Sequence, residues 1–559
     1  MIALDATLRG YKVALVERYD FSSGTSSRST NLLHGGVRYL EDAVKHLNWK
    51  EFMLVFEALH ERKFMLQNAP YLTRPIATVI PVNSWFQMQY VRMGLLMYDI
   101  IALRGGLPRS HAIKWKEMEY VFPRMNFDWA KGGLVYYDGQ SNDSRLNNII
   151  NRTAVENGAV SVNYMEVMSL LHSPCPNHTQ SPHEIVTGVH VRDTLTGNEI
   201  DIRGKVTVNA TGPFADSIIK MYEALSPSPV RHVDCIVPSK GVHLLLQGSL
   251  CPRQAGIITT TSDNRVMFML PWQNYTLVGT TDTPCTIEDQ PDVTDEDIEL
   301  IFAEINKFMH KPITKDDILA VWSGIRPLVR EMNKGTVDTK RISRTHEIWQ
   351  KGDGFITIAG GKWTTVRNMA EDLCDSIERS TSLPIGKCRT KNFKYVGANE
   401  LVGPQEHGSK RARYFEQQID VQRDLEEFYQ MPTDIAEHLS HFYGYRAFEV
   451  AELAKKRGTA RLHESLPYLE AEVPYCVQQE MAVRLSDVIM RRLRIGVTDT
   501  WLTMQCLPKC TVLMKNELGW DRNRCYEELE DTVCQINKCS LKKYDVNVVI
   551  DSMNINYCV

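Results

Sequence analysis

The pattern of apolar and polar positions at the start of the chain predicts a helix followed by a strand. Residues 1–9 have helical spacing and end at Gly10, and the apolar run 13–16 is closed by Glu17. In a βαβ unit that binds a dinucleotide, an acidic residue at this place hydrogen-bonds a ribose hydroxyl. The first strand and the glycine-rich turn of such a unit do not precede this helix. We therefore expect either a shortened chain or a nucleotide site without its usual pyrophosphate-binding turn.

Helical and strand patterns alternate from there to about residue 382. Helical spacing predicts helices at 43–69 and 292–309, and antiparallel strand patterns at 235–247, 264–272 and 276–284 predict a sheet that covers a substrate. Beyond a linker rich in Pro and Gly the pattern is mostly helical, which predicts a separate α-helical domain. The expected division is an α/β domain at 1–382, a linker at 383–405, a helical domain at 406–530 and a tail at 531–559. Within the first domain we expect nucleotide-binding segments at about 1–80, 135–220 and 350–382, and a cap at about 85–130 and 225–345.

Three loops carry residues suited to holding an anion. The first, 24–41, has small hydroxyl residues, the pair Gly35–Gly36 and the cation Arg38. Backbone N–H groups can approach an anion in such a loop, and an arginine adds a bidentate clamp on phosphate or carboxylate. The other two are Thr211–Gly212 after an apolar strand and Gly360–Gly361–Lys362 before a helix, where glycines, a helix N-terminus and a lysine combine. For the first two loops, a solvated loop or a plain turn is the alternative.

Composition and charge narrow the classes of partner. The formal net charge of -4 over 559 residues gives no basic excess for nucleic acid. The 13 cysteines are scattered without C-x2-C spacing, so we expect reduced thiols and no metal site, with Cys506 and Cys510 on one helix face. The dense basic cluster Arg491, Arg492 and Arg494 is expected to be a solvated helix end.

An apolar window at 84–106 is the strongest candidate for contact with a membrane. Arg92 and Asp99 interrupt it, which argues against a span across a bilayer. Its aromatic and aliphatic side chains, flanked by Arg92 and Arg104, suit a headgroup boundary. A buried core helix explains the pattern equally well.

Taken together, the motifs resemble those of one family. FAD-dependent glycerol-3-phosphate dehydrogenases have, in the same order and spacing, the segments GTSSRSTNLLHGGVRYLE, VNATGPFAD, SKGVHLLL, VGTTDTP, SGIRPL, AGGKWTT and EVPYCVQQEMAVRLSDVIMRR. The chain resembles the mitochondrial form from its first residues to about residue 530. The resemblance implies an FAD-binding Rossmann-like α/β domain of the glucose-inhibited division and D-amino-acid-oxidase type, with an antiparallel substrate cap and an α-helical C-terminal domain. It also implies oxidation of sn-glycerol 3-phosphate to dihydroxyacetone phosphate by hydride transfer to FAD. Electrons would pass to ubiquinone from a homodimer bound to the surface of the mitochondrial inner membrane.

The resemblance further implies roles for individual residues. Glu17 is expected to bind the adenosine ribose, and the flavin is expected to be lined by Thr25, Ser26, Thr211, Gly212, Gly360, Gly361, Lys362 and Thr364. Because a phosphate dianion needs several fixed cations, the substrate is expected to contact Arg38, Tyr39, Lys240, Arg326, Arg344 and Lys362. For the base that takes the proton of the C2 hydroxyl we prefer His243, with His34 as the rival.

Two alternative functions stay open at the level of sequence. An oxidase of the same family would pass its electrons to oxygen, and a non-catalytic remnant would keep the cap and the helical domain but hold no FAD. Animal mitochondrial members carry calcium-binding EF-hands after the helical domain, whereas no D-x-[DN]-x-[DN]-G loop occurs here. The tail 545–559 resembles only the exit helix of such a hand, so calcium regulation is not predicted.

Overall fold

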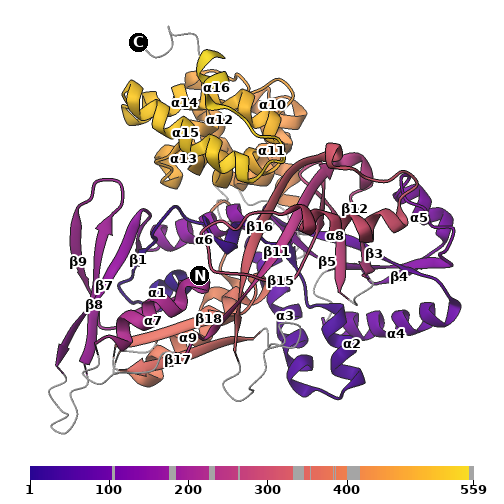
Figure 1. Cartoon of the computed structure of the whole chain (residues 1–559), viewed down its shortest axis with the longest axis horizontal. Coiled ribbons are helices and arrows are strands. Elements are labelled where there is room, and N and C mark those ends of the chain that lie inside the picture. The colour runs from indigo at the N-terminus through magenta and orange to yellow at the C-terminus, as the bar shows by residue number, and fades with distance from the viewer. Residues whose placement is uncertain are drawn as a thin grey trace.

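The protein has an α/β body beneath a layer of helices (Figure 1). The computed structural model describes residues 1–102, 107–174, 184–225, 233–261, 265–330, 345–352, 354–381, 383, 386–398 and 416–552. In Figure 1 the body has a small antiparallel sheet (β7, β8 and β9) on the left and a large sheet on the right, and the two short sheets, which contain β1 and β18, lie between them. This is the α/β fold class with an added helical domain that the sequence predicts.

Each of the two short sheets contains one parallel strand pair, and a third parallel pair, between β3 and β12, lies in the large sheet. β1 (Ala14–Val16) pairs with β6 (Val160–Val162), and β10 (Thr207–Asn209) pairs with β18 (Phe355–Gly360). The other edge of β18 pairs in the antiparallel sense with β17 (His346–Gly352). The helices packed around these strands are α1 (Ile2–Leu8), α6 (Asp143–Glu156), α7 (Ala215–Glu223) and α9 (Val366–Ser380). The helix and strand predicted at the start of the chain are therefore confirmed.

The large sheet is the predicted antiparallel cover. Its strand order is β15-β11-β14-β13-β12-β3-β5-β2, with β16 added to β11 and β4 to β5. The bounds are β2 (Leu32–Leu33), β3 (Thr73–Val82), β4 (His111–Ile113), β5 (Gly132–Ser141), β11 (Ile236–Gln247), β12 (Ala255–Thr260), β13 (Val266–Trp272), β14 (Tyr275–Gly279), β15 (Thr283–Pro284) and β16 (Ile318–Val329). The small sheet has β7 (Met165–Pro174), β8 (Glu184–Asp193) and β9 (Glu199–Arg203).

Alternation along β11 assigns its residues to two environments. Val242, Leu244 and Leu246 pack in one apolar core with Ile298 and Ile301. The latter two belong to α8 (Asp295–Ile305), which begins at a capping box between Thr294 and Asp297 and confirms the helix predicted there. Because successive side chains of a strand point to opposite faces, His243 lies on the face turned away from α8.

The segment predicted as one helix at 43–69 is interrupted in the structure. It is divided between α2 (Val37–Lys45) and α3 (Trp49–Asn68). The Asn48 side chain accepts hydrogen bonds from the N–H groups of Lys50 and Glu51, and this N-cap starts the second helix. The apolar window 84–106 forms α4 (Trp85–Ile101), and α5 (Trp115–Val121) follows. Within the described residues no helix is both long and apolar enough to cross a membrane.

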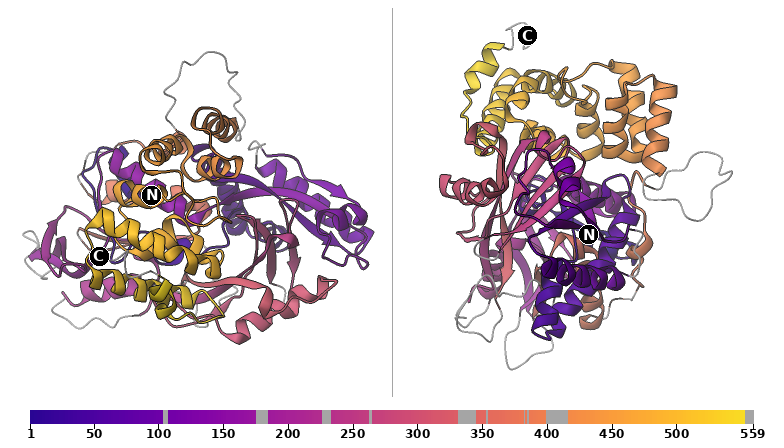
Figure 2. Two further views of the ribbon diagram at one scale, coloured as in Figure 1. Left: turned by 90° about the horizontal axis from the view of Figure 1, so that it is seen from above. Right: turned by 90° about the vertical axis from the view of Figure 1, so that its right-hand side faces the viewer.

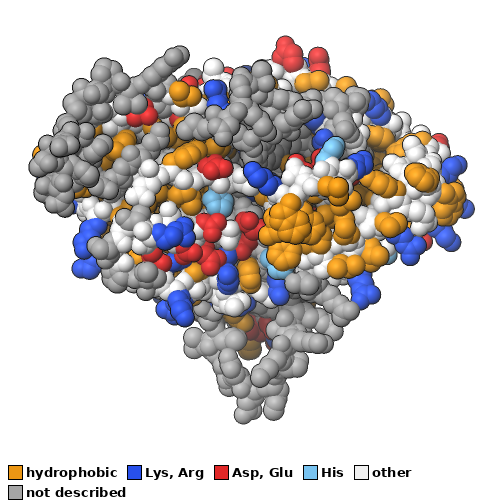
Figure 3. All heavy atoms as spheres, turned by 90° about the horizontal axis from the view of Figure 1, so that it is seen from below, with side chains coloured by type: hydrophobic (Ala, Val, Ile, Leu, Met, Phe, Trp, Pro, Cys, Tyr) orange, Lys and Arg blue, Asp and Glu red, His pale blue; other side chains and the backbone are white. Residues whose placement is uncertain are grey.

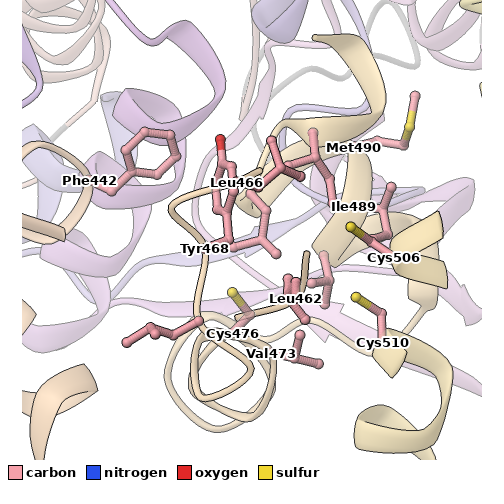
Figure 4. Close-up of a cluster of buried hydrophobic side chains, with 14 of the residues drawn as sticks. Phe442, Leu462, Leu466, Tyr468, Val473, Cys476, Ile489, Met490, Cys506 and Cys510 are labelled. Atoms are coloured by element: carbon pink, nitrogen blue, oxygen red, sulfur yellow. The ribbon is translucent and has the colours of Figure 1, made fainter. Parts of the chain in front are cut away.

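The helical domain packs on the large sheet, and the two share one apolar core. Figure 2 shows its helices stacked over the body, and Figure 4 shows part of its core around Tyr468, Cys476, Cys506 and Cys510. Cys506 and Cys510 are buried on one face of α14, and burial raises the pKa of both thiols. The helices are α10 (Glu416–Tyr429), α11 (Thr433–Tyr443), α12 (Ala447–Arg457), α13 (Glu472–Glu480), a π-helical turn (Asp487–Arg492), α14 (Thr500–Leu518), α15 (Arg522–Lys538) and α16 (Val546–Ser552).

The basic cluster at 491–494 is buried, so its prediction as a solvated helix end is wrong. Arg492 is fully buried, and Arg491 and Arg492 both contact the carboxylate of Asp20 at 2.6 Å. Arg494 lies 3.3 Å from Asp143, another buried carboxylate of the α/β body. The charges are tolerated without water because each guanidinium meets an acceptor from the other domain.

Candidate active site

A cavity of about 500 Å³ lies where the ends of β1 and β10 meet the turn after β18. Its walls include Glu17, Thr25, Ser26, Thr211, Gly212, Gly360, Gly361 and Lys362. These are the residues expected around the cofactor, apart from Thr364. The Thr364 hydroxyl lies next to this wall, where it accepts a hydrogen bond from the His34 N–H at 3.1 Å.

The chain turns around the cavity need glycine. Gly212, Gly360 and Gly361 have φ angles of 59°, 80° and 79°, in the left-handed region that side chains avoid. A Cβ on Gly361 would lie 2.4 Å from the sulfur of Met369 in α9. Backbone therefore forms this wall, which lets a ligand approach the N–H groups before α9.

The hydroxyl loop 22–28 is fastened to the opposite walls of the cavity. Thr25 Oγ1 donates to the Ile325 carbonyl at 2.7 Å, and the Trp363 indole N–H donates to the Ser26 carbonyl at 3.2 Å. Glu17 follows β1 and accepts a hydrogen bond from the Tyr19 N–H at 3.1 Å. A cavity lined by an acidic side chain, glycine backbone, hydroxyls and a lysine fits a dinucleotide flavin.

Lys362 joins this cavity to the loop that holds His34, Arg38 and Tyr39. Its ammonium lies 4.2 Å from the centroid of the Tyr39 ring, within the range of a cation–π contact. Gly36 has a φ of 82°, and a Cβ there would meet the Tyr39 ring. His34 is half-buried, and Arg38 is exposed. The structure thus brings Tyr39 against Lys362, which lines the cavity, and holds the His34 backbone at Thr364 beside it.

His243 is 2% exposed and is held from two sides. Its Nε2 lies 2.9 Å from Thr30 Oγ1, and its ring stacks on Trp322 at 5.6 Å between centroids. Its Nδ1 is buried without a hydrogen-bond partner among the residues that the structure describes. Burial, together with the nearby Arg326 guanidinium, lowers the pKa of His243 to about 3. The imidazole is therefore neutral at physiological pH.

Arg326 lies on the strand beside β11, directly opposite Ser239. Its Nη2 donates to Thr280 Oγ1 at 3.0 Å and to the Thr281 carbonyl at 3.1 Å, and its Nη1 lies 3.4 Å from Asp282 Oδ1. The guanidinium extends over Gly241, where a Cβ would lie 2.4 Å from Nη2. With a quarter of its side chain exposed, this oriented guanidinium can still receive an anion.

Of the expected substrate residues, one lies away from this constellation and another lies outside the described residues. Lys240 points to the opposite face of β11 from His243, and its ammonium pairs with Asp297 at 2.6 Å at the start of α8. Strand alternation separates them, because positions three apart on one strand face opposite sides. Arg344 lies outside the described residues.

Two contacts of the site were not anticipated from the sequence. Thr30 was treated only as one of several loop hydroxyls, yet it is the partner of His243. Tyr98, in the apolar window, accepts a hydrogen bond from the Gly35 N–H at 2.9 Å and donates to Asp138 at 2.8 Å. Its position on the inner face of α4 was the available signal, but its partners lie far away in the sequence.

Comparisons with known proteins identify the same class of cofactor as the residues that line the cavity. Residues 1–370 match the family described as FAD dependent oxidoreductase, and residues 388–525 match the C-terminal domain of alpha-glycerophosphate oxidase. By fold and by site, the protein is therefore an FAD-dependent oxidoreductase.

Individual relatives narrow the class. The chain is 41% identical to the mitochondrial glycerol-3-phosphate dehydrogenase of Bos taurus over 537 aligned residues, and these cover 94% of this chain and 70% of the relative. It is 38% identical to a probable glycerol-3-phosphate dehydrogenase of Encephalitozoon cuniculi, over 97% of this chain and 83% of that one. The crystal structure of the glycerol-3-phosphate dehydrogenase of Bacillus halodurans, complexed with FAD, matches with a TM-score of 0.74 and 27% identity, over 97% and 94% of the two chains. The chain belongs to the family of FAD-dependent glycerol-3-phosphate dehydrogenases, which confirms the resemblance seen in its motifs.

Proposed function

We propose that this protein oxidises sn-glycerol 3-phosphate to dihydroxyacetone phosphate with FAD and passes the electrons to ubiquinone at the mitochondrial inner membrane. One observation supports it most: Lys362 lines the glycine-walled cavity, and its ammonium contacts Tyr39 in the loop that also carries His34 and Arg38. A cofactor cavity with a cation in its wall suits a phosphorylated substrate. The names of the relatives favour this substrate and a mitochondrial location.

The phosphate is bound by Lys362, Arg326 and Arg38 in this proposal. Arg326 is oriented by Thr280 and by the Thr281 carbonyl, so little side-chain entropy is lost when it meets a dianion. Lys362 contributes a compact charge in the wall of the cavity. Bound FAD supplies the acceptor for the hydride that leaves C2 of the substrate.

His34 accepts the proton of the C2 hydroxyl in this proposal, and His243 positions the loop. The pKa of about 3 makes His243 a weak base, and its Nε2 is engaged with Thr30. His34 is half-buried, and its backbone N–H donates to Thr364, two residues beyond the cavity-lining Lys362. The lowered pKa of His243 and the greater exposure of His34 therefore favour His34 as the base over His243, which the sequence alone ranked first.

The histidine assignment is tested by the pH dependence of turnover. We expect H34N to lower kcat by at least about hundredfold and to remove the acidic limb of the pH profile. H243N should lower kcat less and keep that limb. The opposite ranking of the two variants would assign the base to His243.

The reaction itself is tested by the visible spectrum of the purified chain. Flavin bands should bleach when sn-glycerol 3-phosphate is added without oxygen and should persist with glycerol, which lacks the phosphate. Reoxidation is then followed with a short-chain ubiquinone and with oxygen. Hydrogen peroxide formed as fast as quinone is reduced would favour the oxidase, and a colourless protein would favour a non-catalytic remnant.

We propose that the face formed by α2, α3 and α4 rests on the membrane. Figure 3 shows hydrophobic side chains gathered on this lower face, opposite the helical domain. Exposed apolar residues there are Leu47, Trp49, Met53, Phe56, Trp85, Phe86, Tyr90, Met93, Leu96 and Ile100, and the exposed cations Lys45, Lys50 and Arg92 lie among them. Aromatic and aliphatic side chains with cations at their border suit a monotopic contact with anionic lipid.

Vesicle sedimentation tests the membrane face. The double variant W85S/F86S should bind liposomes that contain cardiolipin at least about tenfold more weakly, because both side chains are more than two-thirds exposed on α4. W501S is the matched control, since Trp501 is 58% exposed on the helical domain. Equal binding by both variants would show that the membrane contact lies elsewhere.

The resemblance also leads us to propose a homodimer through the helical domain, for which sedimentation equilibrium should give twice the mass of 63.9 kDa.

A further inference from the structure

We call residues 24–31 the cofactor loop, and only one of its two sides faces the cavity. Thr25 and Ser26 line the cavity, and Thr30 contacts His243. Between them, Ser27 and Ser29 are turned to the other side of the loop, where they meet polar groups from outside it. Beyond the contacts of Thr25 and Ser26 with the cavity walls, the loop is therefore also held from its other side, through Ser27 and Ser29.

Arg494 of the helical domain reaches this loop. It is 1% exposed, and its Nη2 donates to the Ser27 carbonyl at 3.0 Å and to Asp143 Oδ1 at 3.3 Å. It occurs just after the π-helical turn, with a φ of 69°, and its guanidinium stacks over Trp272 at 5.6 Å. A buried guanidinium with charged and carbonyl acceptors is held in one orientation.

Asp143 completes the anchor from the start of α6. Its Oδ2 accepts from the Ser29 N–H at 2.9 Å and from the Ser29 hydroxyl at 2.8 Å. Its own N–H donates to the Asn31 side chain at 3.0 Å. One buried carboxylate thus connects the Arg494 guanidinium with the backbone directly before Thr30.

We propose that Arg494 and Asp143 are positioning residues, through which docking of the helical domain sets the cofactor loop. Arg494 holds Ser27, Asp143 holds Ser29, and the geometry of Ser26 and Thr30 follows from these two anchors. The helical domain is therefore required for the shape of the flavin cavity and for the Thr30–His243 contact. The role in turnover rests on the proposed function, whereas the anchoring of the loop does not.

Limited proteolysis measures the anchor without turnover. Arg28 lies between the two anchored serines, so trypsin cleavage after Arg28 reports opening of the loop. We expect R494Q to speed this cleavage at least about tenfold, because a charge-assisted hydrogen bond is lost. S29A removes the hydroxyl, which donates to Asp143 and accepts from the Asn31 N–H, but keeps the bond from the Ser29 N–H to Asp143. It should therefore produce a smaller increase, which keeps the test available if R494Q fails to fold. R461Q, in an exposed pair with Asp434 on the helical domain, is the matched control and should leave the rate unchanged.

Turnover gives the second readout. With each variant normalised to its bound flavin, we expect kcat to fall about tenfold in R494Q while the KM for sn-glycerol 3-phosphate stays within twofold. The reason is that the proposed phosphate-binding cations, Lys362, Arg326 and Arg38, lie outside the anchored residues 27–30. The proposal would be overturned if R494Q or S29A lowered the melting temperature but left both the rate of cleavage after Arg28 and the kcat per flavin unchanged. Wild-type protein without flavin, combined with faster cleavage in R494Q, would refute the proposed function and leave the anchor in place.

Discussion

Replacing Asp20 with asparagine should loosen the contact between the helical domain and the α/β body. The Asp20 carboxylate accepts hydrogen bonds from Arg491 Nε at 2.6 Å and from Arg492 Nη1 and Nη2 at 2.6 and 2.8 Å. It also accepts one from Asn163 at 3.0 Å. All of this lies away from water, since Asp20 and Arg492 are fully buried.

The expected loss follows from what the partners retain. Breaking one side of a buried ion pair costs about 3–5 kcal/mol. Arg491 keeps Asp487, and Arg492 keeps the Glu480 carbonyl, so neither guanidinium is left without an acceptor. We therefore expect D20N to lose about 3 kcal/mol of unfolding free energy, at the lower end of that range.

Urea unfolding followed by tryptophan fluorescence measures this loss. D434N is the control, because Asp434 pairs with Arg461 at the surface and its removal should cost less than about 1 kcal/mol. Burial alone would raise the pKa of Asp20, but Arg492 and Arg491 lower it below 3.8. The difference between wild type and D20N should thus be constant at neutral pH, and should shrink as the pH falls below 3.8 through the lowered pKa. Equal losses in D20N and D434N would refute the reasoning.

Three further predictions concern the site. G361A should lower the flavin-to-protein ratio, because its Cβ would meet the sulfur of Met369 at 2.4 Å in a left-handed backbone; G94A, on an open helix face, should keep full flavin, and equal ratios would contradict this. K362M should lower kcat/KM for sn-glycerol 3-phosphate about hundredfold in steady-state assays, and wild-type kinetics would remove Lys362 from the site. The lowered pKa of His243 means that the unfolded chain binds its proton first, so this group reduces stability by about 1.4 kcal/mol per pH unit as the pH falls from about 6.5 towards 3. H243Q should flatten the pH dependence of the urea midpoint, and an unchanged slope would show that another group is responsible.

Local patterns were sufficient to predict most elements and the glycine turns that line the cavity. The acidic residue after β1 and the turn at Gly360–Gly361 follow from spacing within about twenty residues, because strand and helix periods and glycine turns are properties of short segments. The break at Asn48 was missed for a related reason. The Asn48 side chain caps the N-terminus of α3, so a new helix begins there although the helical spacing of apolar residues continues across it.

Contacts between distant segments were where prediction from the sequence failed. Lys240 looked suitable as a cation beside His243, but the pleat of β11 turns it towards Asp297. The cluster at 491–494 looked solvated because its acceptors, Asp20 and Asp143, lie more than 300 residues away along the chain. Nothing in the local composition distinguishes a solvated arginine from one that meets a buried carboxylate.

The sequence by itself determined the class of this protein, since the order of its short motifs defines a flavin-binding α/β fold with a helical C-terminal domain. Only the tertiary structure decided that His243 is buried while His34 is half-buried, which lysine lines the cavity, and that Arg494 of the helical domain contacts the cofactor loop. The physical reason is the separation along the chain of the groups that interact. Helices, strands and turns are set by residues close together in the sequence, whereas burial, pKa shifts and ion pairs depend on which distant groups the fold brings together.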